Sequence, residues 1–231
     1  QGGTVTIGGT GSWSGGTTSV TAGNLRVNNG NAIPDGSALT LSGSGALSLL
    51  ADETIGSLAS AVNTTAVALG GKTLTTGGDN TSTQFDGTIG GAGTSNLVKS
   101  GSGTFKLTAS NTYVGSTTIS GGTLAVSGAA AKVGNGSGAI AIGSNTLDIT
   151  NGANVTNPIA ISGGTIANSA GAASVSSGGV LLQSSSVLSS TAGGLSVSAA
   201  IGDGASGFGL TKLGSGTVTL SGPNSFGGPV I

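Results

Sequence analysis

The residues that could carry acid–base chemistry are few and widely spaced. The chain has 231 residues and contains no histidine and no cysteine, so a serine-type triad lacks its base and a cysteine nucleophile is missing. Its acids are Asp35, Asp52, Glu53, Asp79, Asp86, Asp148 and Asp203. A glycosidase or lyase needs several acids on one face, whereas the adjacent Asp52 and Glu53 would point to opposite faces of a strand. We therefore expect no catalytic residues and no enzyme, although acids from different coils could still converge.

One loop could offer oxygen ligands to calcium. Asp79 and Asn80 follow Gly77 and Gly78. Calcium takes about six to eight oxygens, and calcium-binding solenoids carry a nine-residue Gly-Gly-x-Gly-x-Asp repeat that this sequence lacks. The pair is interpreted as a turn, and we expect no metal and no cofactor.

The charge balance excludes another class of partner. Six basic and seven acidic residues give a formal net charge of -1, which offers no electrostatic surface for nucleic acid. No apolar run approaches the ~18 residues of a membrane span, so we expect no membrane insertion by this segment. The first residues do not resemble a signal peptide. The absence of cysteine is compatible with a cytosolic chain or with an exported one.

Short alternating stretches indicate the elements that would position these residues. Apolar side chains alternate in pairs such as Phe105 and Leu107 or Leu124 and Val126, and such pairs recur about every 8–12 residues. A β-sandwich has the same spacing, but its strands are usually longer than the three residues that most of these runs support. The pattern predicts an all-β fold, a parallel β-helix of about ten coils, with residues 1–231 forming one domain.

Two stretches repeat each other at a constant offset. Residues 96–126 and 209–231 share the order Leu-x-Lys, Gly-Thr, Asn-x-aromatic, and a looser copy covers residues 1–27, where Trp13 takes the aromatic position. The residues that define the motif are Leu97, Lys99, Gly103, Thr104, Asn111, Tyr113, Gly115, Gly122 and Leu124 in one copy, and Leu210, Lys212, Gly216, Thr217, Asn224 and Phe226 in the other.

This motif resembles the autotransporter-associated β-strand repeat. The resemblance implies a right-handed parallel β-helix, as the usual crossover rule also requires. It further implies a structural stalk or fibre segment of an exported bacterial surface protein, serving adhesion or surface and biofilm structure. The expected location is secreted or at the cell surface, on the exterior of the Gram-negative outer membrane. The segment would then have been separated from its signal and its membrane anchor.

Several residues allow a second interpretation. Lys99 and Lys212 are interpreted as solvated lysines that discourage sideways strand pairing. The aromatic residues Trp13, Tyr113 and Phe226 are interpreted as corner or core residues and not as a sugar-binding track. A carbohydrate-binding or carbohydrate-processing β-helix, with a host or cell-surface glycan as partner, remains the alternative. Ice binding is a minor one, suggested by the threonine pairs Thr4/Thr6 and Thr217/Thr219.

The two ends of the sequence resemble adjacent parts of the repeat. Joined tail to head, Val230 and Ile231 followed by Gln1, Gly3 and Val5 align with the stretch Thr118 to Leu124. An uncapped solenoid exposes unpaired backbone groups at its ends. We therefore expect either flanking repeats of a longer chain or copies stacked end to end into a filament.

Overall fold

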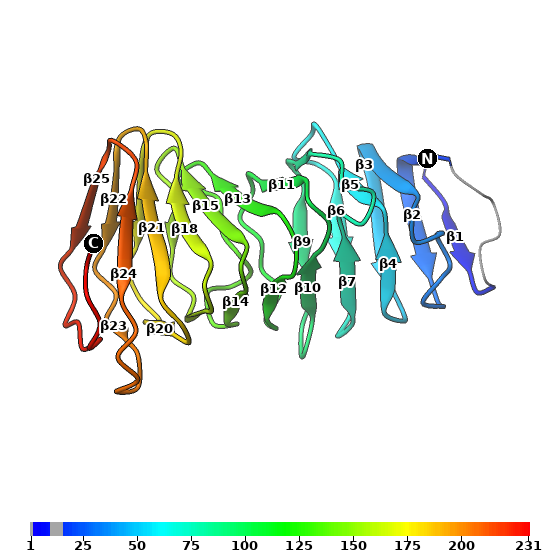
Figure 1. The fold of residues 1–231 in the computed structure, drawn as a ribbon. Helices are drawn as coiled ribbons and strands as arrows, with labels where there is room; N and C mark the ends of the chain where they lie inside the picture. Colours follow the sequence, from blue (N-terminus) through cyan, green and yellow to red (C-terminus); the bar gives the residue numbers. More distant parts are fainter. Residues whose placement is uncertain (1, 10–15) are drawn as a thin grey trace.

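Parallel strands build one long solenoid. The structure is a computed structural model that describes residues 2–9 and 16–231. Figure 1 shows a row of stacked coils with the N- and C-termini at opposite ends of the rod. Strands of neighbouring coils pair in parallel, with partners about 20 residues apart in the sequence, such as Ile140 with Ile159 and Leu97 with Thr117. The predicted all-β parallel solenoid of about ten coils is confirmed.

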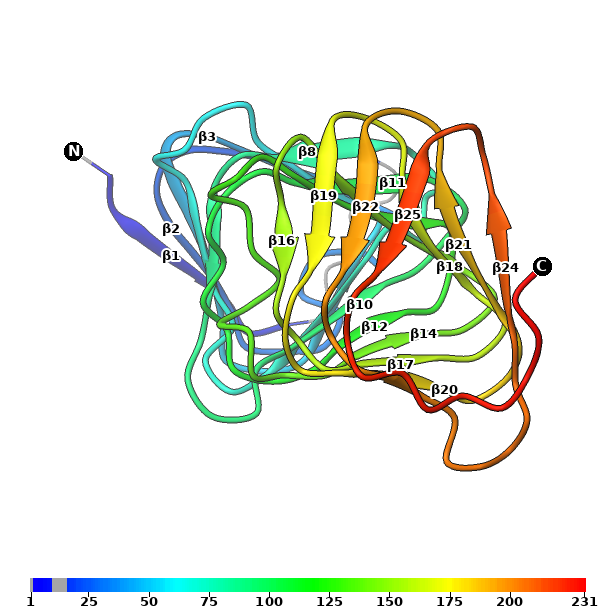
Figure 2. The same cartoon turned by 90° about the vertical axis from the view of Figure 1, so that its left-hand side faces the viewer.

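Each complete coil passes over three faces, called here the first, second and third face (Figure 2). The first face is an eight-stranded sheet of β4 (Glu53–Ile55), β7 (Thr73–Thr76), β10 (Asn96–Lys99), β12 (Thr117–Ile119), β14 (Ile140–Ile142), β17 (Ile159–Ile161), β20 (Val180–Leu182) and β23 (Ile201–Gly202). The second is a seven-stranded sheet of β8 (Thr83–Phe85), β11 (Thr104–Leu107), β13 (Thr123–Ser127), β15 (Thr146–Thr150), β18 (Thr165–Asn168), β21 (Ser186–Ser190) and β24 (Leu210–Leu213).

The third face is divided into two sheets. The first of them contains β1 (Thr4–Ile7), β2 (Thr18–Val27), β3 (Ala38–Leu49), β6 (Ala66–Ala68) and β9 (Thr88–Gly90), with β5 (Ser57–Ala59) pairing beside β3. The other contains β16 (Asn154–Val155), β19 (Ala172–Val175), β22 (Gly194–Val197) and β25 (Thr217–Leu220). Between β9 and β16 the chain crosses this face as irregular segments, residues 109–113 and 131–135.

The core is a set of aliphatic stacks that run along the rod. Ile140, Ile159 and Val180 lie above one another on successive strands of the first face, and each is at least 96% buried. Fully burying one such side chain contributes about 1.5–3 kcal/mol relative to leaving it exposed. Because every coil repeats this contribution, stability is distributed along the solenoid instead of residing in one central core.

Two strands are longer than the sequence pattern suggests. β2 has 10 residues and β3 has 12, because each continues around a corner from the second face onto the third. A register shift between Val20 and Ala22 marks the bend. Gly43 has φ +55, and a Cβ there would lie 2.5 Å from the carbonyl oxygen of Thr21. Glycine thus lets the strand turn without breaking the backbone ladder.

The described part of the chain, residues 2–9 and 16–231, contains no helix with the length and apolar character needed to cross a bilayer.

Candidate functional site: the repeat motif and its corners

The lysine of the middle repeat is buried, and the interpretation as a solvated side chain is wrong. Lys99 ends β10 at the same inward parity as Leu97, and its residue exposure is 0%. Its Nζ donates hydrogen bonds to the carbonyl oxygens of Ser100 at 2.6 Å, Gly101 at 3.0 Å and Gly121 at 3.1 Å. Gly121 belongs to the next coil, so the ammonium group links two coils at the corner between the first and second faces.

The chemistry of this corner depends on burial. Removal from water lowers the pKa of Lys99, and the carboxylate of Asp79 offsets part of that effect. Gly77, in the preceding coil, makes room for the side chain: it has φ +105, and a Cβ there would lie 3.2 Å from Nζ. Three carbonyl acceptors satisfy the three donors of an ammonium group, so this lysine is fully used within the corner.

Lys212 occupies the matching place in the C-terminal repeat. It also lies two residues after a buried leucine, Leu210, and its Nζ also donates to a carbonyl two residues ahead, that of Gly214. Its side chain faces inward, opposite Leu188 of the preceding coil. The two lysines therefore share one corner position. Within the described chain, the Nζ of Lys212 has the single carbonyl acceptor of Gly214, whereas the Nζ of Lys99 has three.

Asn111 replaces the missing strand on the third face. Its residue exposure is 0%, and its Oδ1 accepts a hydrogen bond from the backbone N–H of Ile89 at 2.8 Å. Its Nδ2 donates to the carbonyl oxygens of Ala109 at 3.2 Å and of Lys132 at 2.8 Å. One side chain thus connects the coil below to the coil above where the strand ladder is reduced to isolated backbone hydrogen bonds. Asn224 repeats the first contact, because its Oδ1 accepts the N–H of Ile201 at 3.1 Å.

The aromatic position differs between the copies. Tyr113 is 1% exposed, and its hydroxyl lies 2.7 Å from Oγ1 of Thr117. Burial raises the pKa of this phenol. Phe226 is only partly buried and packs against the core. Trp13 lies outside the described residues. Tyr113 fills the core and offers no ring face to a sugar, as the sequence indicated for this position.

Glycine is required where neighbouring coils approach closely. A Cβ at Gly103 would lie 2.3 Å from the carbonyl oxygen of Thr81, and one at Gly115 would lie 2.4 Å from that of Ser95. Both distances are too short for any side chain, so these repeat glycines are fixed by coil stacking. The other motif residues of the middle copy lie in the same coils: Leu97 and Leu124 in the core, Thr104 at the start of β11 and Gly122 at a corner. In the C-terminal copy, Gly216 and Thr217 lie around the start of β25.

Glu53 is a buried acid that the sequence analysis did not single out as inward-facing. It is 1% exposed, and its carboxylate accepts the backbone N–H groups of Ile33 at 2.7 Å and Ala32 at 3.4 Å. Burial raises the pKa of Glu53 to about 7, the two hydrogen bonds oppose that shift, and Asp35 adds to it. Glu53 lies two residues before the buried Ile55 on β4, and this alternation could have indicated from the sequence that it faces inward.

Asp203 closes a loop between β23 and β24 that projects from the rod (orange in Figure 1). Its carboxylate accepts backbone N–H groups from Ala205 at 3.0 Å, Phe208 at 2.9 Å and Gly227 at 3.0 Å. The N–H of Gly227 is the main cause of the lowered pKa of Asp203.

Asp79 and Asn80 form a turn. Burial alone would raise the pKa of Asp79, but hydrogen bonds from Ser57 and Thr81 outweigh burial and lower it. Oδ1 of Asp79 accepts the N–H of Thr81 at 2.9 Å, and Asn80 has φ +63. Among the residues that the structure describes, no three acids lie together as they would in a metal site.

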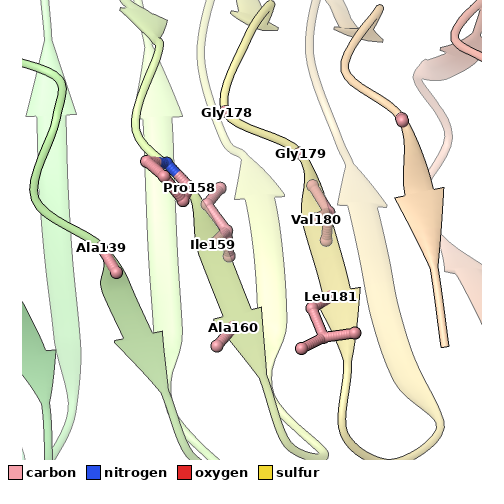
Figure 3. A pocket seen from close by; sticks show the side chains of 9 residues that line it. Ala139, Pro158, Ile159, Ala160, Gly178, Gly179, Val180 and Leu181 are labelled. Carbon is pink, nitrogen blue, oxygen red and sulfur yellow. The ribbon is translucent and has the colours of Figure 1, made fainter. Parts of the chain in front are cut away.

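Two surface hollows differ in the polarity of their lining. One hollow of about 280 Å³ lies on the outer side of the first face and is lined by Pro158, Ile159, Ala160, Val180 and Leu181 (Figure 3). Its lining carries no titratable side chain. A larger hollow of about 600 Å³ includes Asp86 and Thr108, whose side chains hydrogen-bond each other at 2.6 Å.

The threonine pairs do not form a continuous array. Thr4 and Thr6 lie opposite Asn24 and Arg26 on the neighbouring strand. Thr217 and Thr219 lie opposite Gly194 and Ser196. Ice-binding solenoids would need threonine in those neighbouring positions, so the alternative gains no support from this arrangement.

The middle and C-terminal copies lie on different sides of the rod. Leu97 and Phe105 belong to β10 and β11, on the first and second faces. Their counterparts Leu210 and Val218 belong to β24 and β25, on the second and third faces. The copies are thus separated by five coils and one additional face. The motif specifies a corner and the strands beside it, whichever face these occupy.

Comparison with known families identifies the same two stretches. Residues 97–126 and 210–231 match the passenger-associated-transport-repeat family. These are the middle and C-terminal copies of the motif, so the predicted resemblance is confirmed, while the copy expected at residues 1–27 stays a prediction. Searches among curated proteins and among solved structures find no match. The repeat and the solenoid together fit the stalk of an autotransporter passenger. They imply an exported or cell-surface protein and suggest a structural role.

Proposed function

We propose that this chain, which carries two passenger-associated-transport repeats within a β-solenoid, is a structural stalk segment of an exported bacterial surface protein. The observation that carries the proposal is the position of the two matched stretches, which lie on coils of one continuous solenoid. Their motif residues are used in packing and coil-to-coil hydrogen bonds, as Lys99 and Asn111 are.

The architecture is suited to holding other parts of a protein away from a surface. Each coil is tied to the next by backbone ladders on its faces, and the aliphatic stacks continue from coil to coil. The outside is rich in Ser, Thr, Asn and Gly, and only 6% of the residues are charged. Such a rod resists local bending because every coil shares contacts with both neighbours.

The finer role that we propose is adhesion or surface and biofilm structure on the exterior of a Gram-negative outer membrane. A host or cell-surface glycan is the candidate partner for adhesion. The low charge and the hydroxyl-rich exterior of the solenoid are compatible with binding to a glycan. The solenoid would hold this exterior at a distance from the cell.

Location is tested on intact cells that express the full-length native protein. Antibody against residues 1–231 should label whole cells, and externally added protease should remove that label. A chain found only in the soluble fraction of lysed cells would contradict the proposal.

The stalk role is tested by removing whole coils. Deleting residues 140–200 joins Ala139 to Ile201, which stands two strands beyond Ile159 in the register of the first face, so three coils are lost in phase. We expect a shorter rod that is still exported. Cells carrying it should still adhere, but only to partners closer to the cell surface. A matched deletion of residues 147–200 breaks the phase and should misfold. Loss of a specific activity in the in-phase deletion, with the rod intact, would favour a binding or enzymatic site on these coils.

A further inference from the structure

We propose that the larger surface hollow, at the corner between the second and third faces, binds an uncharged sugar unit of a glycan, with the carboxylate of Asp86 as its main hydrogen-bond acceptor. The inference rests on the adhesive role proposed above, and it adds to that role a place on the rod and a class of sugar. It is argued from the position of the hollow, the free polar groups in its lining and their charge.

The hollow lies where the regular ladder of the third face gives way to irregular segments. Its volume is about 600 Å³, and its lining includes Asp86, Thr108 and Ala109 at the corner, Ala130 from a later coil, and residues 61–63 from the loop after β5. Binding sites for small molecules have volumes of roughly 300–1,000 Å³. The hollow is therefore large enough for a sugar unit.

The neighbouring coils leave one side of Asp86 open. Asp86 directly follows β8, and the residues at the same position of the two adjacent coils are Ala61 and Thr108. The hydroxyl of Thr108 meets the carboxylate from one side, whereas Ala61 offers only a methyl group on the other. The side of the carboxylate toward Ala61 therefore lacks a donor from that position.

Hydrogen bonds orient the carboxylate of Asp86 and use one of its two oxygens. Oδ1 accepts the hydroxyl of Thr108 at 2.6 Å and Nε2 of Gln84 at 2.7 Å. No donor from residues 2–9 or 16–231 reaches Oδ2. Hydrogen bonds to an ionised acceptor are about twice as strong as those between neutral groups. An oriented carboxylate with a free oxygen is thus a good acceptor for a sugar hydroxyl.

The rest of the lining complements this acceptor. The carboxamide of Asn63 provides both a donor and an acceptor at the rim of the hollow. Ala61, Val62, Ala109 and Ala130 provide methyl groups, and Val62 is 36% exposed. Small-molecule sites combine such apolar walls with a few polar groups that fix the orientation of the ligand. The C–H groups of a sugar ring would pack on the walls while its hydroxyls bind Asp86 and Asn63.

The charge of the hollow selects the class of sugar. Of the described residues that line it, Asp86 alone carries a charge. A carboxylate with no cation beside it accepts hydroxyl donors and repels the carboxylates of uronic and sialic acids. The ligand that fits is a neutral hexose or N-acetylhexosamine. For a single unit we expect a dissociation constant on the order of 1 mM, and many copies on one cell would raise the overall affinity.

The first test measures sugar binding to the purified chain by saturation-transfer NMR. The probes are the methyl glycosides of glucose, galactose, mannose and N-acetylglucosamine, with methyl glucuronide as the acidic comparator. We expect transfer to at least one neutral glycoside and none to the glucuronide. Asp86→Asn should weaken binding about tenfold, because a neutral carbonyl group replaces the charged acceptor.

Asp148→Asn is the matched control for D86N. Asp148 also accepts a hydroxyl group from the next coil, that of Ser169 at 2.5 Å, but it lies outside the hollow. D148N should therefore bind like wild type. Equal binding by D86N and D148N would overturn the role of Asp86.

The second test blocks the hollow without removing a group that hydrogen-bonds to Asp86. Ala130→Arg places a long side chain in the lining, and Ala129→Arg makes the same change at the adjacent exposed alanine, outside the lining. With circular dichroism unchanged in both variants, A130R should lose binding and A129R should keep it.

Three results would overturn the inference: no transfer to any neutral glycoside, equal binding by A130R and A129R, or stronger transfer to the glucuronide than to the neutral sugars. Labelling of whole cells tests the stalk separately. A chain that is displayed on cells but binds no sugar would refute this site and leave the stalk proposal standing.

Discussion

The ammonium nitrogen of Lys99 lies 3.1 Å from the carbonyl oxygen of Gly121, one coil further along the solenoid. A lysine side chain here performs a task usually left to backbone ladders. It satisfies carbonyl groups that turn away from both sheets at a corner, where no strand is available to pair with them.

Replacing Lys99 by methionine should destabilise the solenoid. The substitution keeps most of the apolar length of the side chain but leaves three carbonyl groups without their donor, and we expect a loss of about 2 kcal/mol or more. The measurement is the free energy of unfolding in urea. Lys106→Met, on the outward side of β11 in the same coil, is the matched control and should change stability by about 0.5 kcal/mol or less. Equal stability of the two variants would contradict the role assigned to the corner.

Asn111→Asp tests the side chain that bridges the interrupted third face. The change preserves shape but turns two donated hydrogen bonds into contacts between a carboxylate and the carbonyl oxygens of Ala109 and Lys132. We expect a loss on the order of 3 kcal/mol and faster amide hydrogen exchange at Ile89 and Thr112. Asn63→Asp, on an exposed loop, should leave both unchanged. Slow exchange retained at Ile89 in N111D would show that the bridge is dispensable.

Glu53 should make stability depend on pH between about 4.5 and 7. Its pKa is about 7 in the folded protein, against 4.5 for an unperturbed glutamate. The folded state therefore holds the proton more tightly than the unfolded state. Stability from this group is fully present below pH 4.5 and is lost as pH rises through 7, by on the order of 3 kcal/mol. Urea unfolding across this range measures the effect. Glu53→Gln should flatten the profile, and an unchanged profile in E53Q would assign the dependence to another group.

Asp203 should act in the opposite direction and at lower pH. Its pKa is lowered in the folded state, so its contribution is present above 3.8, the pKa of an unperturbed aspartate, and is lost as pH falls through the folded pKa. Asp203→Asn should weaken the acceptors that hold the loop of residues 203–209. We expect proteolysis within that loop to become faster in D203N at neutral pH. Asp35→Asn, at an exposed site, is the control, and equal cleavage rates in both variants would refute the prediction.

The sequence predicted the solenoid because inward and outward positions alternate so regularly. Alternating apolar pairs such as Ile159 and Ile161 indicate side chains that face a core. Glycines at the corners limit each strand to a few residues. The same alternation predicts that Lys99 faces inward, because it stands two residues after the buried Leu97. The interpretation as a solvated lysine gave more weight to its charge than to its position.

Other features could not be derived from the sequence. Coil lengths vary, because the paired residues Ile140 and Ile159 are closer in sequence than the paired residues Thr117 and Ile140. The constant offset between the two repeats therefore did not reveal whether it comprised whole coils. The hydrogen bonds of Glu53 to Ala32 and Ile33, and that of Asp203 to Gly227, depend on backbone groups of other segments, which no local pattern specifies. The bridging role of Asn111 could be recognised only from the structure, which shows that the third face is divided into two sheets.

The additional one-face step between the two matched repeats affects how the rod can be recognised from outside. Leu97 and Leu210 start equivalent motifs on different faces, so the exposed side chains of the two copies point in different directions around the long axis. A flat receptor or a single antibody arm can therefore engage one copy at a time, and two copies on one rod do not add avidity toward a planar target. A ligand that wraps around the rod, or receptors approaching from several sides, would meet both. The spacing of the motif thus places the two copies on different faces of the solenoid.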